Sequence, residues 1–181
     1  MSTSYGEALN LITEVKIFMK KALFVLIILV FGLLMADIFE EINDATYSET
    51  VEAVAGTNEF KTYSYNGSIF AALEDKEEIR FFILSTDYSE ATGYQGTTTL
   101  GIILDKDLTV EKMQIIRSQD SPAYIRRINS YGFMRKFEAY KQGDEVEVVT
   151  GATMTSNAII QSVNESIELF RPIIEIFMGD K

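Results

Sequence analysis

The chain has 181 residues and a formal net charge of −11, and it contains neither cysteine nor histidine. This length allows one well-packed core and hardly a second. The missing residues exclude disulfides, thiolate nucleophiles, iron–sulfur ligation and Ser-His-Asp catalysis. The acidic balance argues against nucleic acid as a partner, because phosphate contacts need clustered lysine and arginine.

The first element along the chain is an uninterrupted apolar run from Ala22 to Ala36. Apolar residues on both flanks extend it towards the roughly 20 residues that a bilayer-spanning helix requires. We therefore predict a leader over residues 1–16 and a single transmembrane helix over residues 17–39. A removable signal peptide is an alternative, which the long polar leader and the lack of a small-x-small cleavage site disfavour. A buried helix of a soluble domain is another, disfavoured because the run has no polar face.

Basic residues beside this segment predict its orientation. Lys16, Lys20 and Lys21 precede the apolar run, and the next basic residue after it is Lys61. Positively charged flanks stay on the cytoplasmic side of a membrane. We therefore expect a single-pass protein of the cytoplasmic (inner) membrane, with its N-terminus in the cytoplasm and its main domain outside.

Residues 40–60 are rich in acids, and we expect them to be a linker with a short helix over roughly 38–55, ahead of one domain over residues 61–181. Several short apolar runs follow, and Asn66-Gly67 between two of them favours a two-residue hairpin turn. No βαβ alternation, dinucleotide fingerprint or Walker motif is present. The fold class that we predict is α+β, with a mainly antiparallel sheet and a C-terminal helix. The expected strands are 62–65, 68–73, 79–85, 97–104, 112–117 and 146–149.

The most informative motif is Thr-Gly-Ala-Thr-Met-Thr-Ser over residues 150–156, where the last expected strand gives way to an amphipathic helix. Glycine permits a sharp turn there. The free N–H groups and the positive end of the helix dipole favour an anion such as phosphate, to which hydroxyl side chains add hydrogen bonds. The alternative is structural, in that Thr153 or Ser156 simply caps the helix.

The first six residues of this motif resemble the [Ser/Thr]-Gly-Ala-Thr-x-Thr signature of the FMN-binding domain. That domain occurs in flavin-carrying subunits of Rnf complexes and of sodium-translocating NADH:quinone oxidoreductases. The resemblance implies a covalent FMN, joined through its phosphate to the last threonine of the motif, Thr155. Gly151, Ala152 and Thr153 would shape the turn that presents it.

Two further stretches bear on the resemblance. Gly93-Tyr94-Gln95-Gly96 is similar to the family's Gly-Tyr-x-Gly turn, which precedes a strand near the flavin. Where Rnf-type members show Glu-Thr-Pro-Gly-Leu-Gly, residues 119–124 read Gln-Asp-Ser-Pro-Ala-Tyr, which keeps the proline and a hydroxyl residue before it but lacks both glycines. The resemblance implies a flavin ring between these stretches, close to both tyrosines. The implied cofactor-binding residues are Thr150, Gly151, Ala152, Thr153, Thr155, Gly93, Tyr94, Gly96, Ser121 and Tyr124.

These expectations combine into one leading function. We expect a membrane-anchored electron-transfer subunit with covalent FMN, one part of a multi-subunit complex of the Rnf or NADH:quinone reductase type rather than a stand-alone enzyme. Its partners would be other membrane subunits of that complex and a flavin transferase. We predict no catalytic residue and no metal site, and we expect Asp105-Lys106-Asp107 to be a turn rather than a calcium loop. The alternatives are a tethered flavin-binding sensor or assembly module, and a cofactor-free extracytoplasmic scaffold.

Overall fold

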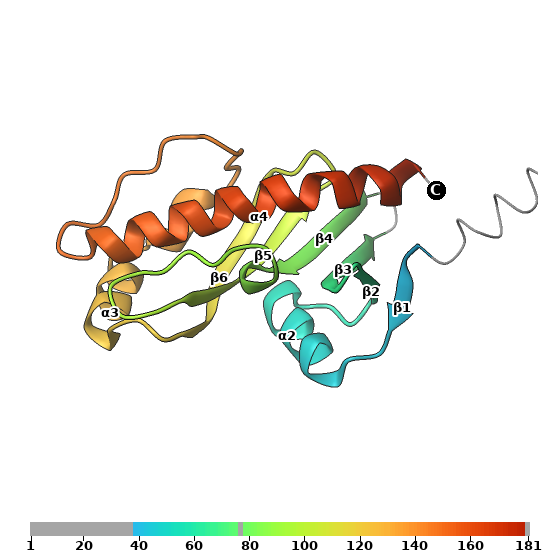
Figure 1. Ribbon diagram of the computed structural model, residues 1–181, viewed down its shortest axis with the longest axis horizontal. Coiled ribbons are helices and arrows are strands. Elements are labelled where there is room, and N and C mark those ends of the chain that lie inside the picture. Colours follow the sequence, from blue (N-terminus) through green and yellow to red (C-terminus); the bar gives the residue numbers. More distant parts are fainter. Residues whose placement is uncertain (1–37, 76–77, 180–181) are drawn as a thin grey trace, which may run out of the picture. The chain divides into compact units, whose positions relative to one another are not determined.

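Strands that follow one another along the chain also lie side by side in one antiparallel sheet (Figure 1). The computed structural model describes residues 38–75 and 78–179, and within them the sheet has six strands. From Glu40 onward the chain is one compact unit. The strands are β1 (Glu40–Ile42), β2 (Phe60–Tyr65), β3 (Ser68–Asp75), β4 (Glu78–Leu84), β5 (Thr98–Asp105) and β6 (Val110–Ser118). The predicted antiparallel α+β fold is confirmed for this part of the chain.

The turns between strands form where the sequence predicts them. Asn66 and Gly67 join β2 to β3 with φ angles of 50° and 87°. A two-residue hairpin needs positive φ at both central positions, which asparagine and glycine tolerate best. The turn from β5 to β6 begins at Asp105, whose Oδ1 accepts hydrogen bonds from the N–H groups of Asp107 and Thr109, each at 2.8 Å. The Asp105–Asp107 segment is therefore a turn, as expected.

Both faces of the sheet are apolar because a helix packs on each. In β4, Phe81 contacts Phe170 of α4 (Thr153–Gly179), with ring centroids 5.7 Å apart. The next residue, Phe82, contacts Tyr47 of α2 (Ala45–Ala55) at 5.6 Å. Successive side chains of a strand point to opposite faces. The helices α2 and α4 therefore cover opposite faces of the sheet, and β5 between them is buried along almost its whole length.

Residues 40–60 contain the expected short helix, but they belong to the folded unit rather than to a linker. They form β1, which pairs with β2, then α2, and then the first residue of β2. Asp44 caps α2 by accepting a hydrogen bond from the N–H of Tyr47 at 2.9 Å. Tyr47, Val51 and Val54 are buried on one face of this helix, at the i, i+4, i+7 spacing of a helix that packs on a core. The folded unit therefore begins at about residue 40 rather than 61.

The predicted strand over residues 146–149 is wrong, because no strand forms between residues 141 and 152. The backbone of Val149 pairs with a side chain instead, since its N–H donates to Oγ of Ser156 at 3.0 Å. Three short elements complete the described residues: η1 (Ser85–Asp87), α3 (Pro122–Ser130) and η2 (Phe133–Phe137). The predicted C-terminal helix is confirmed as α4.

The predicted transmembrane helix over residues 17–39 lies outside the described residues, except for its last two positions. Within residues 38–75 and 78–179, no helix has both the length and the apolar character needed to cross a bilayer. The membrane anchor stays a prediction from the sequence.

Candidate functional site

The threonine turn, residues 150–156, leads directly into α4. Gly151 has a φ of 77°, a left-handed conformation that glycine adopts without strain. The N–H of Ala152 donates to the carbonyl of Val149 at 2.9 Å, and the first helical hydrogen bond runs from the N–H of Ser156 to the carbonyl of Ala152. The sharp turn and the helix start thus form where the sequence predicts them.

This helix start has no side-chain cap. The residue before the first helical position is Ala152, whose methyl group cannot accept a hydrogen bond. The first N–H groups of any helix lack intrahelical acceptors. In the described part of the chain, no group accepts a hydrogen bond from the N–H groups of residues 153–155. Three free donors at the positive end of a helix of 27 residues suit an anion such as a phosphate.

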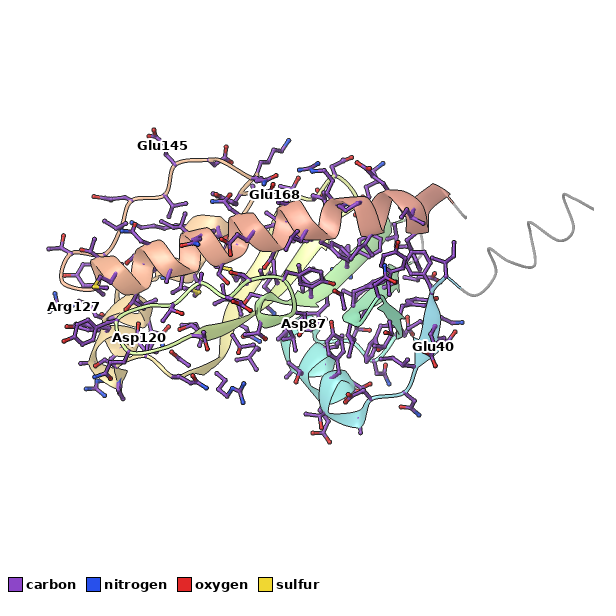
Figure 2. The ribbon with its side chains drawn as sticks, viewed as in Figure 1. Glu40, Asp87, Asp120, Arg127, Glu145 and Glu168 are labelled. Carbon is purple, nitrogen blue, oxygen red and sulfur yellow. The ribbon has the colours of Figure 1, made fainter. Side chains whose placement is uncertain are left out.

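Arg127 of α3 adds a positive charge beside this helix start. Its Nη1 donates to the carbonyl of Thr150 at 2.9 Å. A Cβ atom at Gly151 would lie 2.6 Å from the same Nη1, so the guanidinium group packs against the glycine backbone. The side chain is exposed and keeps further N–H donors for an anion. Figure 2 shows Arg127 at the end of the unit where α4 begins.

The two threonines at the start of α4 have different environments. Thr153, the first residue of the helix, is exposed. Thr155 is only 1% exposed, and its Oγ1 donates a hydrogen bond to Oδ2 of Asp120 at 2.6 Å. The sequence predicts this inward direction, because Thr155 shares a helix face with Ile159 and Val163, which are also buried. The hydroxyl group of Thr153 is therefore accessible and that of Thr155 is not.

Asp120 joins three segments of the site. Its carboxylate accepts hydrogen bonds from the N–H groups of Tyr94 (3.1 Å), Gln95 (2.9 Å) and Ser121 (2.7 Å), in addition to the hydroxyl group of Thr155. We call this set of contacts the Asp120 clasp. The side chain is 4% exposed. Burial opposes its ionisation, but the hydrogen bonds from Thr155 and from the three N–H groups outweigh burial and lower the pKa of Asp120.

Two glycines allow the Gly93–Gly96 turn to lie this close to the clasp. A Cβ atom at Gly93 would come within 2.1 Å of Oδ2 of Asp120, and one at Gly96 within 2.7 Å of Cβ of Gln119. The N–H of Gly93 donates to the carbonyl of Gly96 at 3.0 Å and closes the turn. Both glycines are thus needed for close packing rather than for an unusual φ angle.

Two tyrosines stand at the surface beside the clasp. The rings of Tyr94 and Tyr124 meet edge to face, with centroids 5.2 Å apart and an interplanar angle of 87°. Tyr94 is 55% exposed. The structure thus brings together the Gly93–Gly96 turn, residues 121–124 and the threonine turn, as the resemblance implies. The direct contacts of these residues with a flavin stay predictions.

Sequence reasoning missed Asp120 as a site residue. A signal for it was present, because the family stretch Glu-Thr-Pro has an acid at the position that Asp120 occupies before Ser121 and Pro122. The role of the acid becomes visible only when the fold brings Thr155 to it.

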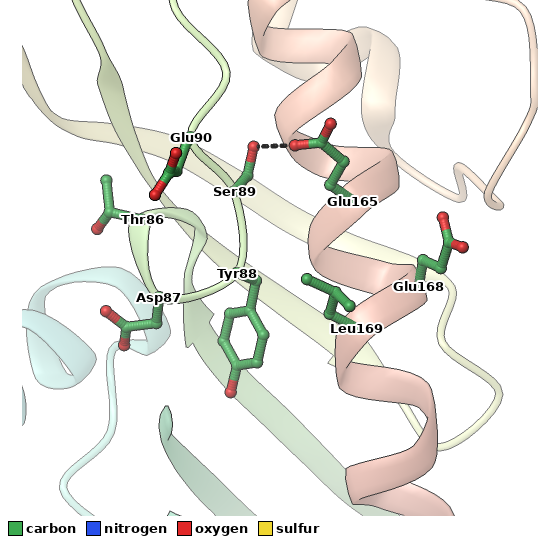
Figure 3. A pocket seen from close by; sticks show the side chains of 8 residues that line it. All are labelled: Thr86, Asp87, Tyr88, Ser89, Glu90, Glu165, Glu168 and Leu169. Carbon is green, nitrogen blue, oxygen red and sulfur yellow. Dashed lines mark hydrogen bonds between the residues drawn. The ribbon is translucent and has the colours of Figure 1, made fainter. Parts of the chain in front are cut away.

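A hollow of about 480 Å³ lies elsewhere on α4 (Figure 3). It is bounded by residues 86–90 and by Glu165, Glu168 and Leu169 of the helix, and Oγ of Ser89 donates to Oε2 of Glu165 at 2.5 Å across it. Acidic side chains line this hollow and repel a phosphate. The surface at the start of α4 therefore suits a flavin nucleotide better than this hollow does.

Residues 93–168 match the family model described as the FMN-binding domain. A search of the curated proteins found no match. The matched region begins at the first residue of the Gly93–Gly96 turn and contains both the Asp120 clasp and the threonine turn. The match is to the family that the threonine motif resembles, and it supports FMN as the cofactor of this part of the chain.

Proposed function

We propose that the protein carries FMN at the start of α4 and acts as an electron-transfer module. The observation that carries this proposal is the uncapped N-terminus of α4 with Arg127 beside it, inside the region that matches the FMN-binding domain. The helix N–H groups and the guanidinium group would hold the flavin phosphate. Bound FMN supplies a redox group that can accept two electrons and pass them on singly.

We further propose a covalent link from the flavin phosphate to Thr155, the last threonine of the motif. The resemblance assigns the phosphoester to this residue, whose hydroxyl group is buried and donates to Asp120. A transferase must reach the oxygen atom that it modifies. Attachment at Thr155 therefore requires the start of α4 to open around this hydroxyl group. Thr153 is exposed at the first position of the helix and is the alternative that the experiment must distinguish.

The flavin ring would pack beside Tyr94 and Tyr124. Tyr94 is exposed and its ring meets that of the half-buried Tyr124, and aromatic faces stack well on a flat heterocycle. Such packing leaves one edge of the ring open to a redox partner. The protein then needs no general base or nucleophile of its own for electron exchange.

Intact-mass measurement and peptide fragmentation test the covalent link. The wild-type chain, produced together with a flavin transferase, should gain the mass of one FMN, and fragmentation should assign it to Thr155. Thr155→Ala should lose the adduct, whereas Ser130→Ala, which removes an exposed hydroxyl group outside the motif, should keep it. An adduct on Thr153 would show that the exposed hydroxyl group is the acceptor instead. A wild-type chain that stays colourless in the presence of the transferase would favour a cofactor-free scaffold.

We also propose that the module is one subunit of a larger redox complex of the Rnf or NADH:quinone reductase type, anchored through residues 17–39. The resemblance of the threonine motif and the apolar run support this proposal. Protease added to wall-free intact cells should cut the domain after Asp44 and spare residues 1–14. Protection of the domain in this assay would reverse the proposed orientation. Co-purification from native membranes would separate an electron-transfer subunit from a tethered sensor, which would lack redox partners.

A further inference from the structure

We propose that the outer face of α4 and the acidic hollow beside it form a docking surface for a basic and apolar segment of a partner subunit. This inference rests on the proposed membership in a redox complex and deepens it, because it names the surface that a partner uses and the chemistry of that partner. The surface consists of residues other than those proposed to bind FMN.

The hollow is the acidic half of this surface. Its carboxylates belong to Asp87 and Glu90 in the segment before β5 and to Glu165 and Glu168 on α4 (Figure 3). Within the part of the chain that the structure describes, none of these four acids forms an ion pair. Hydrogen bonds from Ser89 and from a neighbouring glutamine lower the pKa of Glu165, so its carboxylate is charged at neutral pH. A hollow of about 480 Å³ lined by these carboxylates attracts a cationic side chain.

An exposed apolar line on α4 continues from the hollow. Leu169 lines the hollow and is 55% exposed, Pro172 is exposed, and Ile176 is 38% exposed. Their i, i+3, i+7 spacing places these three side chains on one face of the helix. Phe170 and Phe177 are buried and pack on Phe70 of the sheet, so they belong to a different face. The helix thus carries a second apolar face that the core does not use.

Pro172 also alters the backbone where the hollow meets the apolar line. Proline has no N–H group, so it cannot donate the usual helical hydrogen bond to the carbonyl of Glu168, four residues earlier. This carbonyl lacks its usual donor, and it belongs to the residue whose carboxylate lines the hollow. A guanidinium group presents five N–H donors in a planar fork, which suits several neighbouring acceptors better than a single ammonium group does. Arginine is therefore the cation that fits the hollow best.

Charge selects the occupant of this surface. A second copy of the chain has the same net charge of −11 and the same acids on this face, so it is repelled. Anionic lipid headgroups are repelled for the same reason. A protein segment with an arginine beside apolar side chains complements both halves, because the arginine enters the hollow while the apolar side chains cover Leu169 and Ile176. Charge pairs of this kind steer a partner to its site and fix its register.

The experiment replaces Leu169 by a photo-crosslinking amino acid in the full chain, within its native membranes. Position 131 is the matched control, because Tyr131 at the end of α3 is exposed to a similar extent, at 62%. Mass spectrometry identifies the crosslinked segment. In the same background, Glu165→Lys with Glu168→Lys reverses the charge of the hollow. Thermal unfolding of the purified variants checks the fold.

Charge reversal on α2 is the control for that pair. Glu49→Lys with Glu52→Lys has the same i, i+3 spacing on an exposed helix face, and α2 lies on the opposite side of the sheet. Glu168→Lys alone keeps the bond between Ser89 and Glu165 and tests the charge without disturbing that contact.

The probe at position 169 should crosslink to another membrane subunit, on a segment with arginine beside apolar residues. Reversal of both acids on α4 should lower the yield about tenfold, since like charges then face each other. Glu168→Lys alone should lower it less, and the α2 pair should leave it unchanged. Every variant should keep its FMN mass.

Four results would overturn the inference: a yield at position 169 no higher than at position 131, a crosslink to a second copy or to lipid, a crosslinked segment without basic residues, or a yield that charge reversal on α4 does not lower. A chain that purifies alone from native membranes would refute the proposed complex as well. A chain that purifies with partner subunits but does not crosslink to them from position 169 would refute the docking surface alone.

Discussion

The buried hydroxyl group of Ser156 accepts a hydrogen bond from the N–H of Val149 at 3.0 Å and donates one to the carbonyl of Ala152 at 2.9 Å. One side chain on the first turn of α4 thus holds both the segment before the threonine turn and the turn itself. Because no strand within the described residues pairs with Val149, this side chain sets the geometry in which the turn leads into α4.

Ser156→Ala should therefore destabilise the fold and disturb the turn. Ser156 is 0% exposed, so its loss leaves the N–H of Val149 buried without an acceptor. An orphaned buried donor costs about 1–3 kcal/mol. Urea unfolding should show this loss, whereas Ser130→Ala, which removes an exposed hydroxyl bond in α3, should stay within about 0.5 kcal/mol of wild type. Equal stability of the two variants would contradict this role of Ser156.

Gly93→Ala should be more destabilising than Gly143→Ala. The added methyl group at residue 93 would come within 2.1 Å of Oδ2 of Asp120 and force the clasp apart. Gly143 has a φ of 92° and open space around it, so alanine there meets only backbone strain, of about 1 kcal/mol or a little more. Thermal unfolding of both variants, with Gly179→Ala as an unstrained and open control, tests this order. A Gly93→Ala variant as stable as Gly143→Ala would contradict the tight packing.

The sheet was predictable because its determinants are local. Asn66-Gly67 and the apolar runs of β2 to β6 specify hairpins without reference to distant residues. The prediction that residues 40–60 are a linker is wrong because acids dominate their composition, while the helix α2 directs only Tyr47, Val51 and Val54 into the core. At the site, helical periodicity predicts that Thr155 faces inward, but the consequence of its burial for the linkage needs the fold. Asp120 lies 35 residues from Thr155, and their contact has no local signature.

The stability of the protein should depend on pH through Asp120. Its folded pKa lies below the ordinary value of an aspartate, about 3.9. A carboxyl group whose pKa is lower in the folded state stabilises the protein at pH values above its pKa in the unfolded state. This contribution is lost as the pH falls from the unfolded pKa through the folded pKa. The difference in unfolding free energy between wild type and Asp120→Asn should thus be constant above about pH 5 and shrink below pH 4. Burial raises the pKa of Asp87, which has the opposite effect on stability. Both proteins contain Asp87, so its effect cancels in the difference between their unfolding free energies. A difference that does not vary with pH would contradict the charged clasp.

Phe170→Ala should be among the most damaging core substitutions. Phe170 is fully buried, and its ring meets those of Phe70 (5.4 Å), Phe81 (5.7 Å) and Tyr88 (5.7 Å) edge to face. Truncation of a buried phenylalanine costs about 3–5 kcal/mol. The adjacent Leu169 is 55% exposed, so Leu169→Ala should change the unfolding free energy by no more than about 0.5 kcal/mol. Chemical denaturation of the pair measures how much of the stability comes from the packing of α4 on the sheet.

Arg127→Gln should reduce FMN attachment without weakening the fold. The side chain is exposed and makes one hydrogen bond to the carbonyl of Thr150, so the unfolding free energy should change by no more than about 0.5 kcal/mol. The variant removes the positive charge that we propose for the flavin phosphate, and Arg127→Lys keeps this charge but loses the planar fork of donors. The time course of the FMN mass adduct should be slowest for Arg127→Gln and intermediate for Arg127→Lys. Arg135→Gln, an exposed arginine in η2, is the matched control and should load at the wild-type rate. Equal rates of FMN attachment to Arg127→Gln and Arg135→Gln would show that Arg127 does not bind the phosphate and only donates a hydrogen bond to the threonine turn.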